Sequence, residues 1–194
     1  MVTFAYGLKY DVTPIFETNR LLLRPLRRED GARIQEVFPR MEIAEYLNAS
    51  IPWPYPPDGA EQFLDFILPQ IESGTRFVWS ITLGGELIGL IDLDVEGPFH
   101  RGFWLMPEHH RKGYMTEAVT AVNDFAFDLL KMPLMRLGNA VPNAGSRRIK
   151  EKSGAVLVEV IPDVPFVSGV FPEEVWDLTA EAWRKSRTAF LSGS

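Results

Sequence analysis

The chain has 194 residues, 46% of them hydrophobic, and its 20 basic and 26 acidic side chains give a formal net charge of −6. This length fits one domain with a sizeable core. The acidic balance argues against nucleic acid as the main partner, because nonspecific binding to nucleic acid depends on basic surface. The absence of cysteine excludes disulfides, cysteine-based metal sites and covalent cysteine intermediates.

The sequence contains no run of 18 apolar residues, and its first seven residues lack the basic start and apolar centre of a signal peptide. We therefore expect a cytoplasmic protein with no membrane partner. Residues 1–16 show no clear period and are expected to form an N-terminal extension. A single domain over 17–185 and a C-terminal tail over 186–194 are expected to follow.

The first third of the domain alternates between extended and helical patterns. A strand is expected over 20–26, followed by helices over 28–38 and 41–47. The segment 51–57 has four prolines in seven positions and cannot be regular structure. Asp58 can cap a helix over 59–73, whose apolar face is expected to hold Phe63, Phe66, Ile67 and Ile71.

The period then changes to two, which predicts three antiparallel strands over 77–83, 87–95 and 101–106. A helix with Ala118, Val122, Phe125 and Leu129 on one face follows. Further elements are a strand over 135–141, a helix that starts at Asn143 or Ser146 and ends near 154, and strands over 155–164 and 175–182. Because a helix separates strands 101–106 and 135–141, they are expected to be parallel neighbours in a mixed α/β sheet.

The junction at residues 104–119 is the most informative stretch, because a short strand enters a basic loop with a glycine and then a helix. The first N–H groups of a helix have no intrahelical partner, and the helix dipole is positive there, which suits a phosphate. A P-loop motif is absent, and Gly84, Gly85 and Gly89 fit a hairpin turn rather than a dinucleotide fingerprint. Spacing alone leaves both a phosphate site and a plain connection open.

The run over 102–118 resembles motif A of the GCN5-related N-acetyltransferases (GNAT), most closely the RimJ/RimL-type ribosomal-protein N-terminal acetyltransferases. Residues 17–26, 87–91 and 142–154 are similar to further segments of that branch, in the same order. The match spans about residues 17–180. It implies a single-domain α/β (α+β) fold, with a mixed, mostly antiparallel sheet whose central parallel strands splay apart between flanking helices.

The resemblance implies that acetyl-CoA is the co-substrate and lies where these strands separate. Its pantetheine arm would lie beside Leu105, Met106 and Pro107, where a backbone N–H can polarise the thioester carbonyl. Its pyrophosphate would be held mainly by backbone N–H groups of His110, Arg111, Lys112, Gly113, Tyr114, Met115 and Thr116. Relatives usually have Gln or Arg in place of His110 and Gly or Ala in place of Met115, so Met115 could narrow the cleft.

Two residues are expected to act in catalysis, in which the amine attacks directly within a ternary complex. Ser146 stands in the branch's Asn-x-x-Ser pattern after Asn143, and its hydroxyl would hydrogen-bond the CoA sulfur; the alternative role is a helix cap. Lys150 occupies the place where many relatives carry an acidic Tyr. His100, where relatives often have Glu, could accept a proton, although a lone loop histidine is more often ordinary. No metal site is expected, because adjacent histidines diverge and no ligand spacing recurs.

In the resembled family the region of Trp53 and Tyr55 borders the acceptor site, although a loop that only packs over the core edge is an alternative. Asp92 could lead a water chain into the cleft or be an exposed strand-edge charge. We expect transfer of acetyl to a primary amine, first of all a protein N-terminal α-amine, by a monomer or homodimer. The alternatives are a small amine, such as a polyamine or an antibiotic, and a non-catalytic acyl-CoA-binding sensor.

Overall fold

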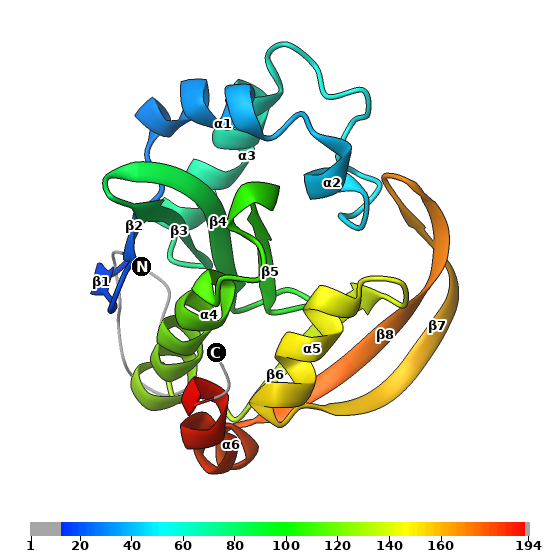
Figure 1. Cartoon of the computed structure of the whole chain (residues 1–194). Coiled ribbons are helices and arrows are strands. Elements are labelled where there is room, and N and C mark those ends of the chain that lie inside the picture. Colours follow the sequence, from blue (N-terminus) through cyan, green and yellow to red (C-terminus); the bar gives the residue numbers. More distant parts are fainter. Residues whose placement is uncertain (1–12, 193–194) are drawn as a thin grey trace.

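The structure, a computed structural model, describes residues 13–192 and is built on two sheets that meet along one side (Figure 1). All strand pairs within them are antiparallel. The five-stranded sheet has the order β1 (Phe16–Glu17), β2 (Leu22–Pro25), β3 (Arg76–Leu83), β4 (Glu86–Asp94) and β5 (Arg101–Leu105). The three-stranded sheet has the order β6 (Leu134–Ala140), β8 (Gly169–Thr179) and β7 (Val156–Phe166).

Helices cover both faces of the five-stranded sheet. One core cluster joins α1 (Gly31–Val37) and α3 (Gly59–Glu72) to one face, and a second joins α4 (Tyr114–Asp124) to the other. The remaining helices are α2 (Met41–Ala44), α5 (Ala144–Ser153) and α6 (Ala180–Ser192). Figure 1 shows α4, α5 and α6 together on one side of the molecule. The expected α/β fold with a mostly antiparallel sheet is thus confirmed.

The two sheets are joined where β5 and β6 begin. The His100 N–H donates to the Arg136 carbonyl at 2.8 Å, and the Arg136 N–H donates to His100 Nδ1 at 2.9 Å. Beyond this point β5 and β6 belong to different sheets, and Figure 1 shows a gap between them that α4 and α5 flank. Each strand leads directly toward one of these helices, so the gap lies beside two helix N-termini.

A second contact forms at the far end of the β7–β8 hairpin, with the segment that follows α2. The Val167 N–H donates to the Leu47 carbonyl at 3.0 Å, and the Ser168 hydroxyl donates to the Glu45 carbonyl at 2.7 Å. The hairpin tip therefore lies against the segment after α2, as Figure 1 shows. The space between the two sheets is closed on this side.

Several elements differ from those predicted. Strand β8 begins at Gly169 and ends at Thr179, and α6 follows it with no predicted counterpart. A local signal for α6 exists, because the Thr179 hydroxyl caps it by accepting from the Ala182 N–H at 3.1 Å. The expected boundary after residue 185 falls inside α6. In α6 Trp183 is fully buried and its indole donates to Asp124.

The expected N-terminal extension is described only from Thr13 onward, since residues 1–12, like 193–194 of the expected tail, lie outside the described residues. Thr13 is buried, and the Pro14 carbonyl accepts from the Trp79 indole at 2.7 Å. Residue 16 already belongs to β1. None of the helices in the described ranges is long and apolar enough to span a membrane.

Helix α3 packs against the core with most of its predicted apolar face, since Ile67 is buried and Phe63 and Ile71 are partly buried, but Phe66 is an exception. Ala60, Leu64 and Ile67 are buried against the sheet, whereas Phe66 is 65% exposed. Asp58 makes no side-chain cap bond; instead, the Ala60 N–H donates to the Gln35 side chain at 2.9 Å. The prediction for Phe66 was therefore wrong, and its exposure has another reason, described below.

In the helix after Gly113, the buried face shifts by one residue along the sequence. Ala118, Val122 and Phe125 are buried as predicted, but Leu129 is 43% exposed and Leu130 is buried instead. The reason is a π-helical turn over Phe125–Leu129, which fits an extra residue into one turn and moves the apolar face along by one position.

This phase change predicts different costs for two adjacent substitutions. Leu130→Ala should lower the free energy of unfolding by about 2–5 kcal/mol, because it leaves a cavity in the core. Leu129→Ala, its matched control, should change that free energy by only about 0.5 kcal/mol. Urea denaturation of both variants measures the difference, and equal losses would contradict the π-helical register.

Candidate active site

The loop between β5 and α4 forms a cradle of backbone N–H groups. After a 3-10 turn over Pro107–His109, Arg111 and Gly113 both adopt positive φ, at 58° and 81°. The first bond of α4 runs from the Glu117 N–H to the Gly113 carbonyl, so the N–H groups of residues 114–116 have no carbonyl within the helix to bind. They stand at the positive end of the helix dipole. The geometry therefore suits an anionic group such as a pyrophosphate.

The side chains of this loop are held in place by neighbouring elements. His110 Nε2 lies 2.8 Å from the Leu105 carbonyl oxygen, so the imidazole joins the loop to the end of β5. Met115, in the first turn of α4, is buried in the core, so its side chain does not narrow the cleft, and only its backbone can meet a ligand. Arg111 and Lys112 are exposed and add positive charge at the surface.

Arg20 was not among the predicted site residues, yet it braces this loop. Its guanidinium donates to the Lys112 carbonyl at 2.8 Å, pairs with Glu117 at 2.7 Å and lies 4.5 Å from the centre of the Tyr114 ring. The Thr18 hydroxyl also donates to Glu117, at 2.5 Å. The only sequence signal was that this residue falls in the first of the family-like segments. These contacts tie the loop to the segment between β1 and β2.

The end of β5 directs a backbone donor into the gap between β5 and β6. The Met106 N–H donates to the Ile88 carbonyl of β4 at 2.9 Å. Because backbone groups alternate in direction along a strand, those of Leu105 point away from β4 and toward the gap. The side chains of Leu105 and Met106 are buried, and Pro107 is partly exposed.

The structure decides between the two predicted starts of α5. Asn143 is the N-cap, and its side chain accepts from the Ser146 N–H at 3.0 Å. The Ser146 hydroxyl is therefore not a cap. It accepts a hydrogen bond from Lys150 Nζ at 2.7 Å, and both side chains are buried.

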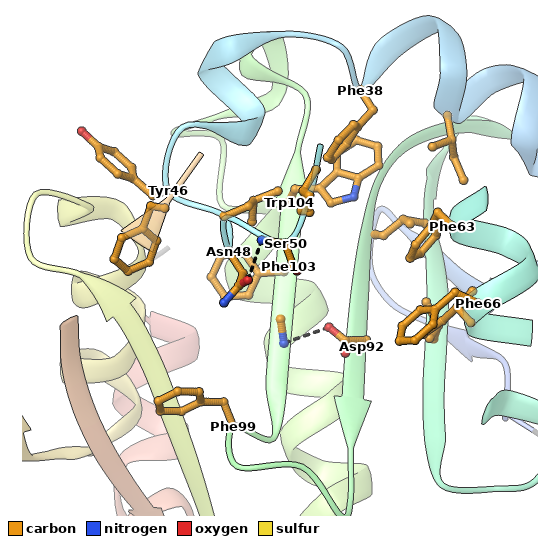
Figure 2. Close-up of a pocket in the computed structure, with 18 of the residues that line it drawn as sticks. Phe38, Tyr46, Asn48, Ser50, Phe63, Phe66, Asp92, Phe99, Phe103 and Trp104 are labelled. Atoms are coloured by element: carbon orange, nitrogen blue, oxygen red, sulfur yellow. Dashed lines mark hydrogen bonds between the residues drawn. The ribbon is translucent and has the colours of Figure 1, made fainter. Parts of the chain in front are cut away.

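A cavity of about 770 Å³ lies on the opposite side of the five-stranded sheet, between α1, α3 and the β7–β8 hairpin. Figure 2 shows aromatic side chains around it, among them Phe63 and Phe66, which explains the exposure of Phe66 on α3. Tyr55 lines the cavity as predicted and packs on Phe38 at 4.8 Å between ring centres, and burial raises its pKa to about 12. Trp53 does not line it.

Two carboxylates line this cavity. Asp92 accepts from Arg76 Nε at 2.7 Å and from the Gly102 N–H at 2.9 Å (Figure 2); burial raises its pKa, and Arg76 opposes this rise. The side chain of Glu173 on β8 makes no hydrogen bond with any residue the structure describes; burial raises its pKa, and the nearby Lys150 opposes this rise. Glu173 was not predicted, because it precedes the expected start of its strand and belongs to no motif.

The predicted base His100 is not among the residues that line the cavity. Its Nδ1 accepts the Arg136 N–H, as described above, so this nitrogen holds β5 against β6. This position favours a structural role for His100.

Comparisons with known proteins agree with this arrangement. Residues 20–156 match the acetyltransferase (GNAT) domain, and the chain belongs to this family. It is 31% identical over 154 residues to the uncharacterised N-acetyltransferase YoaA of Bacillus subtilis (strain 168), which covers 73% of this chain and 82% of YoaA. The predicted membership of this superfamily is confirmed, and the protein is an acetyl-CoA-dependent N-acetyltransferase.

Solved structures share the fold. Mycobacterium smegmatis RimJ in complex with CoA-disulfide has a TM-score of 0.79 at 15% identity and covers 92% of this chain and 93% of its own. Spermidine N-acetyltransferase from Vibrio cholerae, in complex with CoA and spermine, has a TM-score of 0.70 at 22% identity and covers 85% of this chain and 98% of its own. The ribosomal-protein-S5-alanine acetyltransferase from Vibrio fischeri also shares the fold, with a TM-score of 0.74 at 19% identity over 88% of this chain and 98% of its own, so the fold does not define the acceptor.

The loop geometry predicts a specific sensitivity at Gly113. Gly113→Ala should cost about 1–2 kcal/mol of stability, because a Cβ is strained at positive φ. It should also weaken CoA binding about tenfold or more, a loss of about 1.4 kcal/mol, since the backbone there must approach the phosphates.

Gly85→Ala is the matched control, because Gly85 also has positive φ, at 90°, but lies in the distant β3–β4 turn, where an added Cβ would meet nothing within 4 Å. It should lose similar stability and keep CoA affinity. Isothermal titration calorimetry with CoA separates the two variants, and equal affinities would contradict the assignment of the cradle.

Proposed function

We propose that the protein transfers acetyl from acetyl-CoA to the α-amine of a protein N-terminus, which enters through the aromatic cavity. The observation that carries this proposal is that the cavity reaches the gap between the sheets. Its lining includes Gly102 and Phe103 of β5 and Gly138 and Asn139 of β6. An amine in the cavity and a thioester on the helix side of the gap would therefore meet between the two strands.

The walls of the cavity favour an apolar chain end over a polycation. Aromatic and aliphatic side chains dominate the lining, and its volume of about 770 Å³ fits the range of ligand pockets and could accept the first residues of a peptide. Asp92 is already neutralised by Arg76, which leaves Glu173 as the one lining carboxylate without a partner in the described part of the chain. A polyamine would need several free carboxylates, whereas an N-terminal amine needs one.

The residues near the gap have groups suited to each step of a direct acetyl transfer. The His110 N–H already donates to the Pro107 carbonyl at 3.1 Å, so the backbone N–H groups of residues 111–116 would hold the pyrophosphate, with Asn143 fixing the start of α5 on the other side of the gap. The Leu105 N–H would stabilise the oxyanion that forms when the amine attacks the acetyl carbon. Glu173 would accept the proton that the attacking nitrogen loses. As the carbon–sulfur bond breaks, the Ser146 hydroxyl would donate to the leaving thiolate.

The acceptor proposal predicts the outcome of a thiol-release screen. Peptides with apolar N-terminal residues should release CoA from acetyl-CoA with a higher kcat/KM than peptides with acidic N-termini. Spermidine and an aminoglycoside should give no release above background. The same peptides with a blocked N-terminus are the control and should be inactive. Turnover of spermidine without turnover of any peptide would overturn the acceptor while leaving acyl transfer in place.

The role of Glu173 predicts a pH effect. A base acts when deprotonated, so kcat should fall as pH decreases through the pKa of Glu173, and the raised pKa places this fall above the usual range of a glutamate. Glu173→Gln should lower kcat about 100-fold and remove the acid limb of the profile.

The exposed Glu159 of β7 provides a matched substitution, Glu159→Gln, that should leave the profile unchanged. His100→Ala tests the expectation for His100 in the same assay. If the acid limb moves in His100→Ala and stays in place in Glu173→Gln, then His100 is the base and Glu173 is not.

A further inference from the structure

Two cations are buried beside the gap between β5 and β6, and one of them, Arg101, also lines the aromatic cavity. Lys150 of α5 is 2% exposed and Arg101 of β5 is 7% exposed. Neither forms a salt bridge within residues 13–192, and two guanidinium nitrogens of Arg101, Nε and Nη2, have no hydrogen-bond partner there. The third, Nη1, donates to Asn123 of α4. A buried unpaired cation costs stability, so this arrangement suggests a use other than folding.

The charged groups that face Lys150 are Arg101 from β5 and Glu173 and Glu174 from β8. Burial and the nearby Arg101 lower the pKa of Lys150 well below its usual value, and the two glutamates oppose this only in part. The carboxylate of Glu174 is occupied, because it accepts from Asn139 and Arg147 at 2.9 Å each. Lys150 can therefore exchange a proton far more readily than an ordinary lysine.

The single hydrogen bond that the described structure gives Lys150 leads to Ser146. Nζ lies 2.7 Å from the Ser146 hydroxyl, one turn earlier on the same helix. Ser146 is in the first turn of α5, directly after its Asn143 cap, where the helix borders the gap. The Lys150 ammonium, the Ser146 hydroxyl and the gap thus follow one another in space.

We propose that Lys150 is the proton source for the leaving thiolate of CoA and acts through the Ser146 hydroxyl. The inference rests on the proposed position of the sulfur beside Ser146. When the carbon–sulfur bond breaks, the thiolate takes the Ser146 hydroxyl proton, and Ser146 takes a proton from the Lys150 ammonium. Lys150 is left as a neutral amine and regains a proton from water after CoA leaves. Lys150 therefore acts on the thiolate only through Ser146, to which it gives a proton, and is a positioning residue. Arg101 helps Lys150 to release that proton, because a nearby positive charge favours the neutral amine.

The main test compares Lys150→Met, which removes the charge, with Lys150→Arg, which keeps a charge that cannot be released. Both should lower kcat about 100-fold, with the KM for acetyl-CoA close to that of the wild type. The wild-type rate should fall as pH rises through the pKa of Lys150, because the acid must be protonated, and this alkaline limb should vanish in both variants. Lys152→Met, on the exposed part of the same helix, should behave like the wild type.

Stability gives a readout that separates this role from a structural one. Lys150→Met should have a Tm equal to or above that of the wild type, because it replaces a buried unpaired ammonium with an apolar chain. A double-mutant cycle adds the link to Ser146: Ser146→Ala and Lys150→Met together should lose no more kcat than either alone. Additive losses, or a lowered Tm with an unchanged alkaline limb, would overturn the relay.

A reaction without any amine keeps the test independent of the proposed acceptor. Slow hydrolysis of acetyl-CoA by water releases the same thiolate, so thiol release without an amine should be slower in Lys150→Met and Lys150→Arg than in the wild type and in Lys152→Met. Equal hydrolysis in all four proteins would overturn the relay. Slower hydrolysis in the two Lys150 variants, together with no turnover of peptides by the wild type, would count against the proposed acceptor and leave the relay supported.

Discussion

The separation of β5 from β6 is the constraint on which the rest of the structure depends. Two hydrogen bonds between His100 and Arg136 hold the strands together where they begin, and no further ladder forms between these two described strands beyond them. The unpaired backbone of β5 then faces a gap instead of a neighbouring strand. We propose that the two substrates meet at this separation, each approaching from its own side of the sheet.

The two sides of this gap have different chemistry. On the helix side lie the N-termini of α4 and α5, the braced loop over 110–116 and the buried pair Lys150 and Ser146, all of which suit an anionic and sulfur-bearing substrate. On the other side lies the aromatic cavity, whose lining includes Glu173 and Arg101. The hairpin tip, which contacts the segment after α2, forms one wall of this cavity. This difference between the two sides is the basis on which we propose opposite faces of one sheet for CoA and the acceptor.

Some of the site could be predicted because it depends on local sequence. The strand, loop and helix around Gly113 follow from periodicity and from the conformational freedom of glycine, whereas the individual residues of the cradle were expected from the family resemblance. Other residues of the site could not be predicted from local sequence. Arg20 and Glu173 lie far from the motif in sequence, and only strand pairing brings them to it. Lys150 was seen as a departure from the family pattern, but its hydrogen bond to Ser146 depends on burial as well as on helical spacing.

The sequence by itself determined the family and the order of most elements, including the helix that starts after Gly113, because these depend on spacing along the chain. Only the tertiary structure decided that Phe66 of α3 is exposed, where the π-helical turn moves the core to Leu130, and which carboxylate side chain remains without a hydrogen-bond partner, among the described residues, beside the gap. The physical reason is that burial and charge pairing are set by neighbours that are distant in sequence. A pattern of residue types cannot say which polar group a folded chain leaves unpaired.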